Sequence, residues 1–447
     1  MSKLKFLISV YTAKITSCVL KLLTKSAGTS LPGLLALKLD KDILNEFQNQ
    51  VKKNIITVTG TNGKTTVSNL VTAILEADNN IIFNNHQGAN MLSGITSALA
   101  CNFSFSKKAD YFVLESDEAY LSKLYDHLKA DYLIVTNLFR DQLDRYGELD
   151  STFKKINKAI DKNSKLKILL NADDPNVAKL AANNEQIFYG FEDIEVCYDD
   201  KNLQSPKEAI NCFCGEEFSY EKVFYSHLGI YYCNNCKAKR PLLKYIAKAK
   251  IFKDYIEIFV NGMKFKSYLS GIYNAYNLLS AISLGLELNI DPLKIQLALD
   301  NFKTVFGRCE KIKIKNKEVI VQLIKNPVGA IEVFRTVNID NKNKLLIILN
   351  DNYADGRDVS WIWDINFASL KGYKNKIFVS GLRAYDLAVR LKYAGIDEKN
   401  IIVVKNIKKA LDEILNIPDK DFEKLFIFPT YTALMELEPI LDKLKKS

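Results

Sequence analysis

The sequence has 447 residues, of which 48% are hydrophobic and 26% charged, and its formal net charge is +10 at pH 7. This length predicts two or three domains, and the composition is that of a folded protein and excludes long disordered tracts. The lysines are scattered along the chain rather than gathered with aromatic residues into one basic stretch. The charge therefore indicates a solvated surface and argues against a nucleic-acid-binding protein.

The N-terminal segment predicts an amphipathic helix. Lys3 and Lys5 precede an apolar run that resembles a short signal peptide, but Lys14 interrupts it, and no stretch reaches the about 18 apolar residues of a membrane span. Apolar residues recur at helical spacing along one face: Leu4, Ile8, Tyr11, Ile15, Val19 and Leu22. We expect this face to pack on its own domain in a cytoplasmic protein, with peripheral contact with the inner membrane face as the open alternative.

The strongest motif lies between a predicted strand, Ile55 to Val58, and a predicted helix, Val67 to Leu75. Two glycines in the connecting loop let the backbone approach a polyanion, and amides at the helix start point toward it. Lys64 adds a cation for the β- and γ-phosphates, and a threonine hydroxyl can hold Mg²⁺. An ordinary glycine turn is the alternative. The combination of strand, glycines, Lys-Thr and helix favours ATP binding by Gly60, Thr61, Asn62, Gly63, Lys64, Thr65 and Thr66.

Short apolar runs alternate with helical segments from Ile55 to about Gly190, which predicts βαβ units in a mainly parallel sheet. Such sheets bind ligands beyond the carboxyl ends of their strands, where polar residues fall in this sequence. Glu115 ends one strand and is our candidate Mg²⁺ ligand together with Thr65, whereas the acids at 117 and 118 also fit a helix N-terminus. Polar residues follow the next two strands as well, at 136–148 and 171–175.

Four of the eight cysteines are clustered. A CxC pair and a CxxC pair lie 19 residues apart, counted from Cys214 to Cys233, in a stretch from about 205 to 241 that interrupts the first α/β region. The spacing predicts a structural Zn²⁺ site, with reduced thiols as the alternative and His227 as a substitute for one ligand. The predicted ligands are Cys212, Cys214, Cys233 and Cys236. The isolated cysteines are expected to be buried small hydrophobes: Cys18, Cys101, Cys197 and Cys309.

A second α/β unit is predicted from Cys309 onward. Its strands are expected near 319–324, 345–349, 376–379, 401–404 and 425–428. The stretch from Asn350 to Asp364 follows the second of these strands and holds four acids, an arginine and both tryptophans of the chain. A turn, a helix cap and core tryptophans would explain these residues, so the pattern alone favours a structural role.

The chain resembles the ATP-binding domain of the Mur ligase family over about residues 40 to 310, in TGTNGKTT, the strand-end Glu115, Thr136 to Gly147, NADDP and GIYNAYN. The resemblance implies ATP-dependent joining of an amino group to a carboxylate through an acyl phosphate. It also implies that Asn274, Asn277 and Arg308 contact the nucleotide. Many Mur ligases carry a histidine where this chain has Gln142, and no counterpart of their carbamylated lysine can be placed. The number of Mg²⁺ ions is therefore left open.

Nearly the whole chain resembles, more narrowly, the ligase subunits of lipid II isoglutaminyl synthases. The shared stretches are LPG at 31–33, NxxGANM ending at Met91, TNLFRDQLDRYGE, the cysteine insertion, FGR at 306–308, IKNPVG at 324–329 and NDNYADGRDVSWIWD. The resemblance implies amidation of the D-glutamate α-carboxylate in the stem peptide of lipid II. The nitrogen would come from glutamine through a GatD-type glutaminase in a heterodimer. The second acid of DGRD, Asp358, would complete the catalytic triad of that partner, with Asp355 as the competing residue.

The residues themselves agree with a separate glutaminase. Glutamine hydrolysis of that class needs a cysteine on a sharp elbow and a histidine base, yet the sequence has no G-x-C-x-G and only three histidines: His86, His127 and His227. A stand-alone Mur- or folylpolyglutamate-type ligase that adds an amino acid is the alternative function. The expected fold is α/β: a Mur ligase-type P-loop domain over 1–308 with an inserted zinc ribbon, then a smaller α/β domain over 309–447 with the partner interface.

Overall fold

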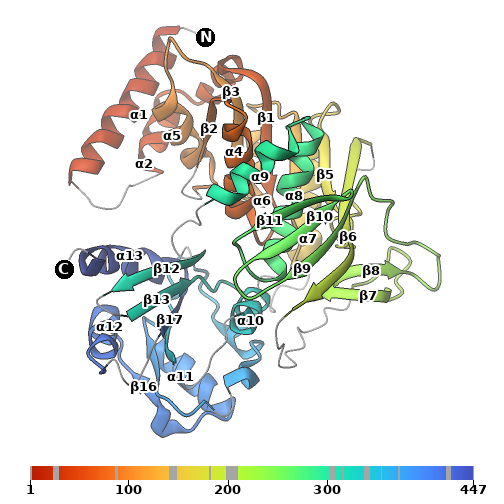
Figure 1. Cartoon of the computed structure of the whole chain (residues 1–447). Coiled ribbons are helices and arrows are strands. Elements are labelled where there is room, and N and C mark those ends of the chain that lie inside the picture. Colours follow the sequence, from red (N-terminus) through yellow and green to blue (C-terminus); the bar gives the residue numbers. More distant parts are fainter. Residues whose placement is uncertain are drawn as a thin grey trace. The chain divides into compact units, whose positions relative to one another are not determined.

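The computed structural model divides into two compact units, the first ending at Phe302 and the second beginning at Lys303 (Figure 1). Each unit is described by itself below. The structure describes residues 3–23, 30–85, 89–139, 148–180, 183–197, 210–302, 308–314, 317–336, 343–353, 355–370, 373–418 and 424–445.

The first unit is built on one large sheet. Its strands are β1 (Val51–Thr59), β2 (Ile82–Asn84), β3 (Ala109–Glu115), β4 (Tyr132–Val135), β5 (Lys167–Asn171), β6 (Glu185–Val196), β9 (Tyr245–Ile251), β10 (Ile256–Val260) and β11 (Met263–Ser267). Among the described residues the strand order is β11-β10-β9-β6-β5-β4-β1-β3-β2. Neighbours from β9 to β2 run parallel, and β9, β10 and β11 form an antiparallel edge. The parallel strands predicted from buried apolar runs are therefore present.

Helices cover both faces of this sheet. They are α1 (Lys3–Leu23), α2 (Leu31–Leu39), α3 (Ile43–Phe47) with the 3-10 turn η1 (Gln48–Gln50), α4 (Lys64–Ala77), α5 (Leu92–Asn102), α6 (Glu118–Leu124), α7 (Glu148–Ile160), α8 (Ile272–Glu287) and α9 (Pro292–Asn301). On one face α1, α3, α5, α6 and α7 share a core with alternate strand residues such as Ile55, Phe112 and Leu133. On the other face α4 contacts β1, β2 and β3 and packs against α8 and α9. Both faces of the strands are thus shielded from water.

The N-terminal helix α1 buries the face opposite to the predicted one. Phe6, Val10 and Ala13 are buried, and the Phe6 ring packs edge-on against Phe47 and Phe103. The side chains predicted to pack on the domain are exposed: Leu4, Ile8, Tyr11, Ile15, Val19 and Leu22. The predicted helix and its packing on its own domain are confirmed, but the predicted face was wrong. Helix α1 has apolar residues on both faces, and periodicity does not say which face is covered. Among the described residues, no helix is long and apolar enough to cross a membrane.

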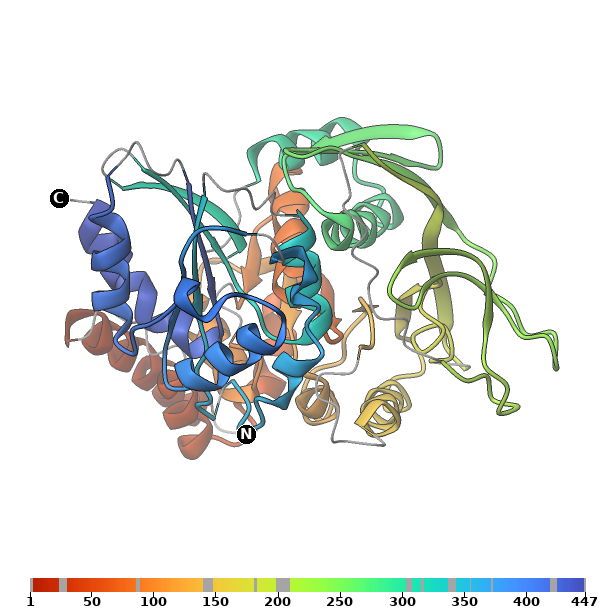
Figure 2. The same cartoon turned by 90° about the horizontal axis from the view of Figure 1, so that it is seen from below.

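The cysteine-containing insertion between β6 and β9 forms a small hairpin of β7 (Ser219–Tyr225) and β8 (Leu228–Tyr232). Figure 2 and Figure 1 both place this hairpin and α1 at opposite ends of the first unit. The hairpin has a small core of its own, formed by Ile210, Cys212, Phe218, Tyr231 and Cys233. Contrary to expectation, three isolated cysteines are exposed: Cys18, Cys101 and Cys197. The side chain of Cys309 lies outside the described part of the chain.

The second unit is a smaller sheet with helices on both faces. Its strands are β12 (Arg308–Ile314), β13 (Lys317–Gln322), β14 (Asn343–Ile348), β15 (Ile377–Ser380), β16 (Ile401–Val403) and β17 (Lys424–Pro429). Their order in the described residues is β12-β13-β17-β14-β15-β16, parallel except for the β12–β13 hairpin. Its helices are α10 (Pro327–Thr336), η2 (Ser360–Trp363), η3 (Phe367–Leu370), α11 (Ala384–Tyr393), η4 (Glu398–Asn400), α12 (Ile407–Leu415) and α13 (Tyr431–Lys445).

Alternate residues of its central strands serve two separate cores, Leu345 and Ile347 on the side of α10 and α11, and Leu346 and Ile348 on the side of α12 and α13. The predicted α/β fold, with a P-loop unit followed by a smaller α/β unit, is confirmed.

Candidate functional site

The glycine-rich loop leaves β1 and enters α4 at Lys64. Gly60 and Gly63 have φ of +124° and +85°, angles that other residues rarely adopt. Neither position has room for a side chain, because a Cβ at Gly60 would overlap the hydroxyl of Thr136 and a Cβ at Gly63 would overlap the side-chain oxygen of Asn277. The loop is thus held between the end of β4 and the start of α8, and it leads into the N-terminus of a 14-residue helix, which favours anions.

The segment after β4 holds this loop in shape. The amides of Thr61 and Asn62 donate to the backbone and side-chain oxygens of Asn137, each at 2.9 Å. The Thr136 hydroxyl donates to the Asn62 carbonyl at 2.7 Å. The Thr61 hydroxyl donates to the Phe139 carbonyl at 3.2 Å and accepts from the Phe139 amide at 3.1 Å. Residues 136–139 begin the polar stretch that the sequence places after a strand, and they form the second wall of the phosphate loop.

Lys64 is nearly buried and folds back over its own loop. Its ammonium donates to the Gly60 carbonyl at 2.5 Å and to Glu118 Oε1 at 3.1 Å. The two charged side chains of this ion pair are only 9% and 15% exposed, so solvent screens them little. The sequence predicted a helix N-cap at Asp117 or Glu118, and Asp117 is the N-cap of α6 and accepts from the Ala119 amide. The Lys64–Glu118 pair had no signal in the sequence, since 54 residues separate its members.

Glu115 ends β3 beside Val58 of β1, as predicted for a residue that faces the phosphate loop. Its side chain is 2% exposed, and Oε1 accepts from Asn90 Nδ2 at 3.2 Å. Its other oxygen, Oε2, is buried without a hydrogen-bond partner in the structure. A buried carboxylate oxygen without a donor is costly, and a hard cation would satisfy it. The residues present therefore fit a Mg²⁺ ion.

The remaining predicted nucleotide residues are grouped by the first turn of α4 and the first turns of α8. Thr65 and Thr66 are both 8% exposed, next to Lys64. Asn277 lies against Gly63 and donates to Asn274 Oδ1 at 3.1 Å. The structure therefore brings Asn274 and Asn277 to the phosphate loop. The side chain of Arg308 and all of Gln142 lie outside the described part of the chain.

Asp174, which follows β5, connects the phosphate-loop wall to the cysteine-containing hairpin. Its Oδ2 accepts from the Leu138 amide at 2.8 Å, and its Oδ1 lies 3.2 Å from Nε2 of His227 in the β7–β8 turn. The His227 ring also packs edge-on against Phe139, with ring centroids 4.7 Å apart. His227 is therefore occupied here, and the hypothesis that it replaces a cysteine ligand is wrong. The metal-ligand spacing of the cysteines could not reveal this, because His227 contacts residues far away in the sequence.

Asp173 makes a second connection to the same hairpin, because its carbonyl accepts from the Gly229 amide of β8 at 2.9 Å. Its carboxylate accepts from Arg240 Nη1 at 2.7 Å, from the Tyr276 hydroxyl at 2.9 Å and from the Phe191 amide at 2.8 Å. Burial raises the pKa of Asp173 to about 6, against the opposing effect of the Arg240 charge. The two adjacent aspartates thus fix the hairpin to the end of β5 and to the wall of the phosphate loop.

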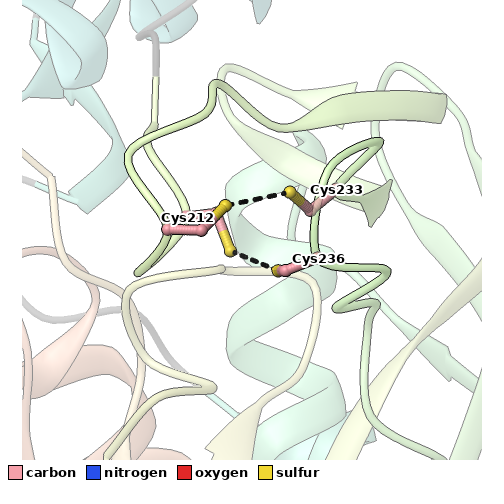
Figure 3. A group of neighbouring side chains, drawn as sticks. Cys212, Cys233 and Cys236 are labelled. Carbon is pink, nitrogen blue, oxygen red and sulfur yellow. Dashed lines mark hydrogen bonds between the residues drawn. The ribbon is translucent and has the colours of Figure 1, made fainter.

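The four clustered cysteines converge as predicted. Figure 3 labels three of them, Cys212, Cys233 and Cys236. The sulfurs of Cys212 and Cys236 are 3.3 Å apart, those of Cys214 and Cys233 are 3.5 Å apart, and all four lie within 4.8 Å of one another. Metal–sulfur bonds of about 2.3 Å in a tetrahedron place sulfurs about 3.8 Å apart. The donor set therefore fits a closed Zn²⁺ site.

Polar residues also follow β14 in the second unit, but most of them bind residues at or near the starts of α11 and α13. Asp355 accepts from the backbone amide and the hydroxyl of Thr432, at the start of α13. Asp351 binds Arg383 Nε at 2.9 Å. Asp358 is half-buried and accepts from the Ser360 amide at 2.8 Å. Asp355 is thus committed to holding the N-terminus of α13.

The tryptophans of this stretch take different roles. Trp361 is buried in the core beside α11, whereas Trp363 is 49% exposed and lies against Tyr393 and Arg390. Core burial therefore explains only one of the two.

The fold is shared with ligases of known structure. A pseudomurein peptide ligase type C from Methanothermus fervidus superimposes with a TM-score of 0.68 at 24% identity, over 88% of this chain and 79% of that one. The MurF ligase from Acinetobacter baumannii matches with a TM-score of 0.65 at 14% identity, over 93% of this chain and 81% of that one. A family model of the Mur ligase middle domain matches residues 58–285. The fold and the phosphate loop thus define the class as Mur ligase-like.

Comparisons of sequence identify a particular family within this class. A model of the MurT ligase C-terminal region matches residues 323–434. The lipid II isoglutaminyl synthase (glutamine-hydrolyzing) subunit MurT of Streptococcus pneumoniae is 34% identical over 93% of this chain and 92% of its own. The subunit of the same name from Staphylococcus aureus is 35% identical over 94% of this chain and 93% of its own. The chain belongs to the MurT family of Mur ligase-like subunits.

Proposed function

We propose that this chain is the ATP-dependent ligase subunit of a glutamine-hydrolysing lipid II isoglutaminyl synthase, acting in the cytoplasm. The nucleotide half is carried by one observation: Lys64 and the glycine loop lie at the sheet edge where Glu115 leaves a buried oxygen without a hydrogen-bond partner. Kinship over more than nine-tenths of the chain with subunits of that name supports the substrate half. The acceptor is the D-glutamate α-carboxylate of the peptidoglycan stem peptide.

At the nucleotide end, the amides from Gly60 to Gly63 and the start of α4 bind the phosphates of ATP. When ATP binds, the Lys64 ammonium leaves the Gly60 carbonyl and Glu118 and binds the γ-phosphate. Thr65 and Glu115 hold Mg²⁺, which supplies charge neutralisation for phosphoryl transfer when it is bound. Asn274, Asn277 and Arg308 contact the nucleotide, and Thr61, Asn62 and Thr66 complete its binding site.

The reaction has two steps. A glutamate carboxylate oxygen attacks the γ-phosphorus, the bond to the β-phosphate oxygen breaks, and ADP leaves. Ammonia then attacks the carbonyl carbon of the acyl phosphate, loses a proton, and expels inorganic phosphate to leave the carboxamide. Positioning and electrostatic stabilisation by the phosphate loop supply most of the catalysis, because the protein forms no covalent bond to the substrate.

A partner glutaminase of the GatD type supplies the ammonia. The C-terminal domain, residues 309–447, carries its interface, and Asp358 completes the triad by orienting the partner's histidine and stabilising the imidazolium. Asp358 is favoured over Asp355 because the two oxygens of Asp355 already bind Thr432 at the start of α13.

The cysteine cluster holds a structural Zn²⁺ that fixes the hairpin carrying His227. Replacing Cys233 with serine should remove about one equivalent of zinc per chain, measured by atomic emission of the purified protein. The exposed Cys197→Ser provides the control and should retain the metal. Zinc retained in full by Cys233→Ser, or absent from the wild type, would contradict this assignment.

The function is tested by asking which amine supports phosphate release. The chain, purified with and without its partner, is given ATP, Mg²⁺ and lipid II together with ammonium, glutamine or single amino acids. We expect ammonium to support turnover by the chain alone and glutamine only in the presence of the partner. Phosphate release with an amino acid, and none with ammonium, would instead identify a stand-alone amino-acid-adding ligase.

A further inference from the structure

Helix α1 has a second apolar face that its own domain does not cover. Phe6, Val10 and Ala13 on the inner face are buried in the first unit. The outer stripe lies within an arc of about 80° at about 100° per residue. The six side chains of this stripe are between 44% and 81% exposed: Leu4, Ile8, Tyr11, Ile15, Val19 and Leu22. A soluble helix that packs on one side normally carries polar residues on the other, so this stripe is unusual.

The neighbouring helix α2 extends the exposed apolar surface. It packs against α1, and its residues Leu31, Leu34 and Leu39 are each between 43% and 45% exposed. Exposed apolar side chains gathered on two packed helices indicate a site of interaction.

The charge around the stripe has one sign only. Residues 1–39 contain six lysines and no aspartate or glutamate, in a chain in which 52 of 447 residues are acidic. On the helical wheel Lys5 falls on one side of the stripe, and Lys3, Lys14 and Lys21 fall on the other. Lys5 lies 3.7 Å from the buried Asp40, and Lys14 donates to the Phe103 carbonyl at 2.6 Å. Lys3 and Lys21 can extend their ammonium groups toward phosphate headgroups while their alkyl stems cover apolar surface.

We propose that the exposed face of α1, continued by α2, docks this protein on the surface of an anionic phospholipid bilayer. The helix lies in the plane of the interface with the stripe in the boundary between headgroups and acyl chains. A second copy of the chain is a poorer occupant, because two acid-free, lysine-bearing faces would repel each other. The anionic surface complements both the charge and the apolar stripe. Under the proposed function, this docking would hold the ligase beside a lipid-linked substrate.

The test is vesicle flotation of the full chain, which requires no catalysis and is therefore independent of the proposed function. The vesicles contain either equal amounts of phosphatidylglycerol and phosphatidylcholine or phosphatidylcholine alone. We expect wild-type protein to float with the anionic vesicles and about tenfold less with the neutral ones. The double variant Ile8→Ser/Ile15→Ser should bind about tenfold more weakly than wild type, and Lys3→Gln/Lys21→Gln should bind more weakly at low salt only.

The matched control is a pair of exposed leucines on one face of α9. Leu293 and Leu297 are 78% and 54% exposed, close to the 51% and 63% of Ile8 and Ile15. Leu293→Ser/Leu297→Ser should float as wild type does. All variants replace exposed side chains, and circular dichroism and thermal melting confirm that they fold.

Three outcomes would overturn the proposal. The first is wild-type protein that does not float with anionic vesicles. The second is equal loss of binding in the α1 and α9 variants. The third is a wild-type protein that sediments as a dimer without lipid and becomes a monomer in Ile8→Ser/Ile15→Ser, which would identify a second copy as the occupant.

Discussion

Polar side chains follow parallel strands in both sheets, yet the two edges are built differently. At the edge of β1, β3 and β4 the polar groups clamp a glycine loop, and Glu115 keeps a buried oxygen without a hydrogen-bond partner. At the edge of β14 the acids are bound to neighbouring residues: Asp351 pairs with Arg383, and Asp355 accepts from the Thr432 amide. A polar residue after a strand is therefore weak evidence of a site. An unsatisfied, buried acceptor beside a cradle for anions is stronger evidence.

The comparison also separates two ways in which an acid can serve a reaction. Glu115 is buried in its own unit, so its ligand must enter the site. Asp358 is half-buried and accepts from the Ser360 amide, and under the proposed function it acts on the histidine of a partner. The variants described next test the roles assigned to residues at these two sheet edges.

Lys64→Ala should have the largest effect. Removing the cation at the γ-phosphate should lower the rate of ATP-dependent amidation by about 10⁴-fold with glutamine and with ammonium alike. The measurement is phosphate release under saturating ATP. Lys123→Ala, an exposed lysine of α6, is the control and should keep the wild-type rate. Unchanged turnover in Lys64→Ala would contradict the proposal that this loop binds ATP for the reaction.

Asp358→Asn should act on one nitrogen source only. Without the carboxylate the partner's histidine loses its orientation, so glutamine hydrolysis should fall by about 10³-fold while ammonium-driven amidation is unchanged. Asp355→Asn provides the comparison and should lower the melting temperature through the loss of its bonds to α13, at a cost of about 1–2 kcal/mol. If Asp355→Asn, rather than Asp358→Asn, abolishes glutaminase activity, the two roles are reversed.

Glu115→Gln should change the response to metal. An amide is a weaker ligand than a carboxylate for a hard cation, so the Mg²⁺ concentration for half-maximal activity should rise by about 10- to 100-fold. The measurement is a Mg²⁺ titration at constant ATP. Glu118→Gln, which breaks only the ion pair with Lys64, should leave that concentration near the wild-type value. Equal metal dependence in all three proteins would show that Glu115 is structural.

Asp173→Asn should produce the smallest effect, a change in the pH dependence of stability. The pKa of Asp173 is about 6 in the folded protein and about 4 when unfolded, so folding is favoured by protonation, and stability falls as pH rises through this window. Between pH 4 and pH 7 the wild type should therefore lose about 1–3 kcal/mol relative to the variant. The measurement is urea unfolding at both pH values. A parallel pH dependence of the two proteins would show that Asp173 does not titrate in this range.

Much of the fold could be predicted from the sequence because the structure depends on local patterns. Buried parallel strands are continuous apolar runs, and the phosphate loop requires glycines at Gly60 and Gly63 for their backbone angles and close contacts. The four cysteines were found from spacing for the same reason. Interactions between distant residues had no such pattern. The pair Lys64–Glu118 and the contact of Asp174 with His227 depend on how the sheet brings its loops together.

The face of α1 could not be predicted for a different reason. Both faces of this helix are apolar, so periodicity identifies two candidates and burial decides between them. The inner face of Phe6 and Val10 is shorter and less regular than the exposed stripe, and it is the one that packs against Phe47 and Phe103.

The central claim is that this chain transfers nitrogen from a partner's glutamine to a stem-peptide carboxylate at the cost of ATP. Glutamine labelled with ¹⁵N in its amide is supplied with ATP, Mg²⁺, lipid II and the partner, and the product is analysed by mass spectrometry with ADP measured in parallel. We predict one ¹⁵N in the α-carboxamide of D-glutamate for each ADP formed, and no label with Lys64→Ala. A product that carries an added amino acid, or no ¹⁵N, would contradict the account.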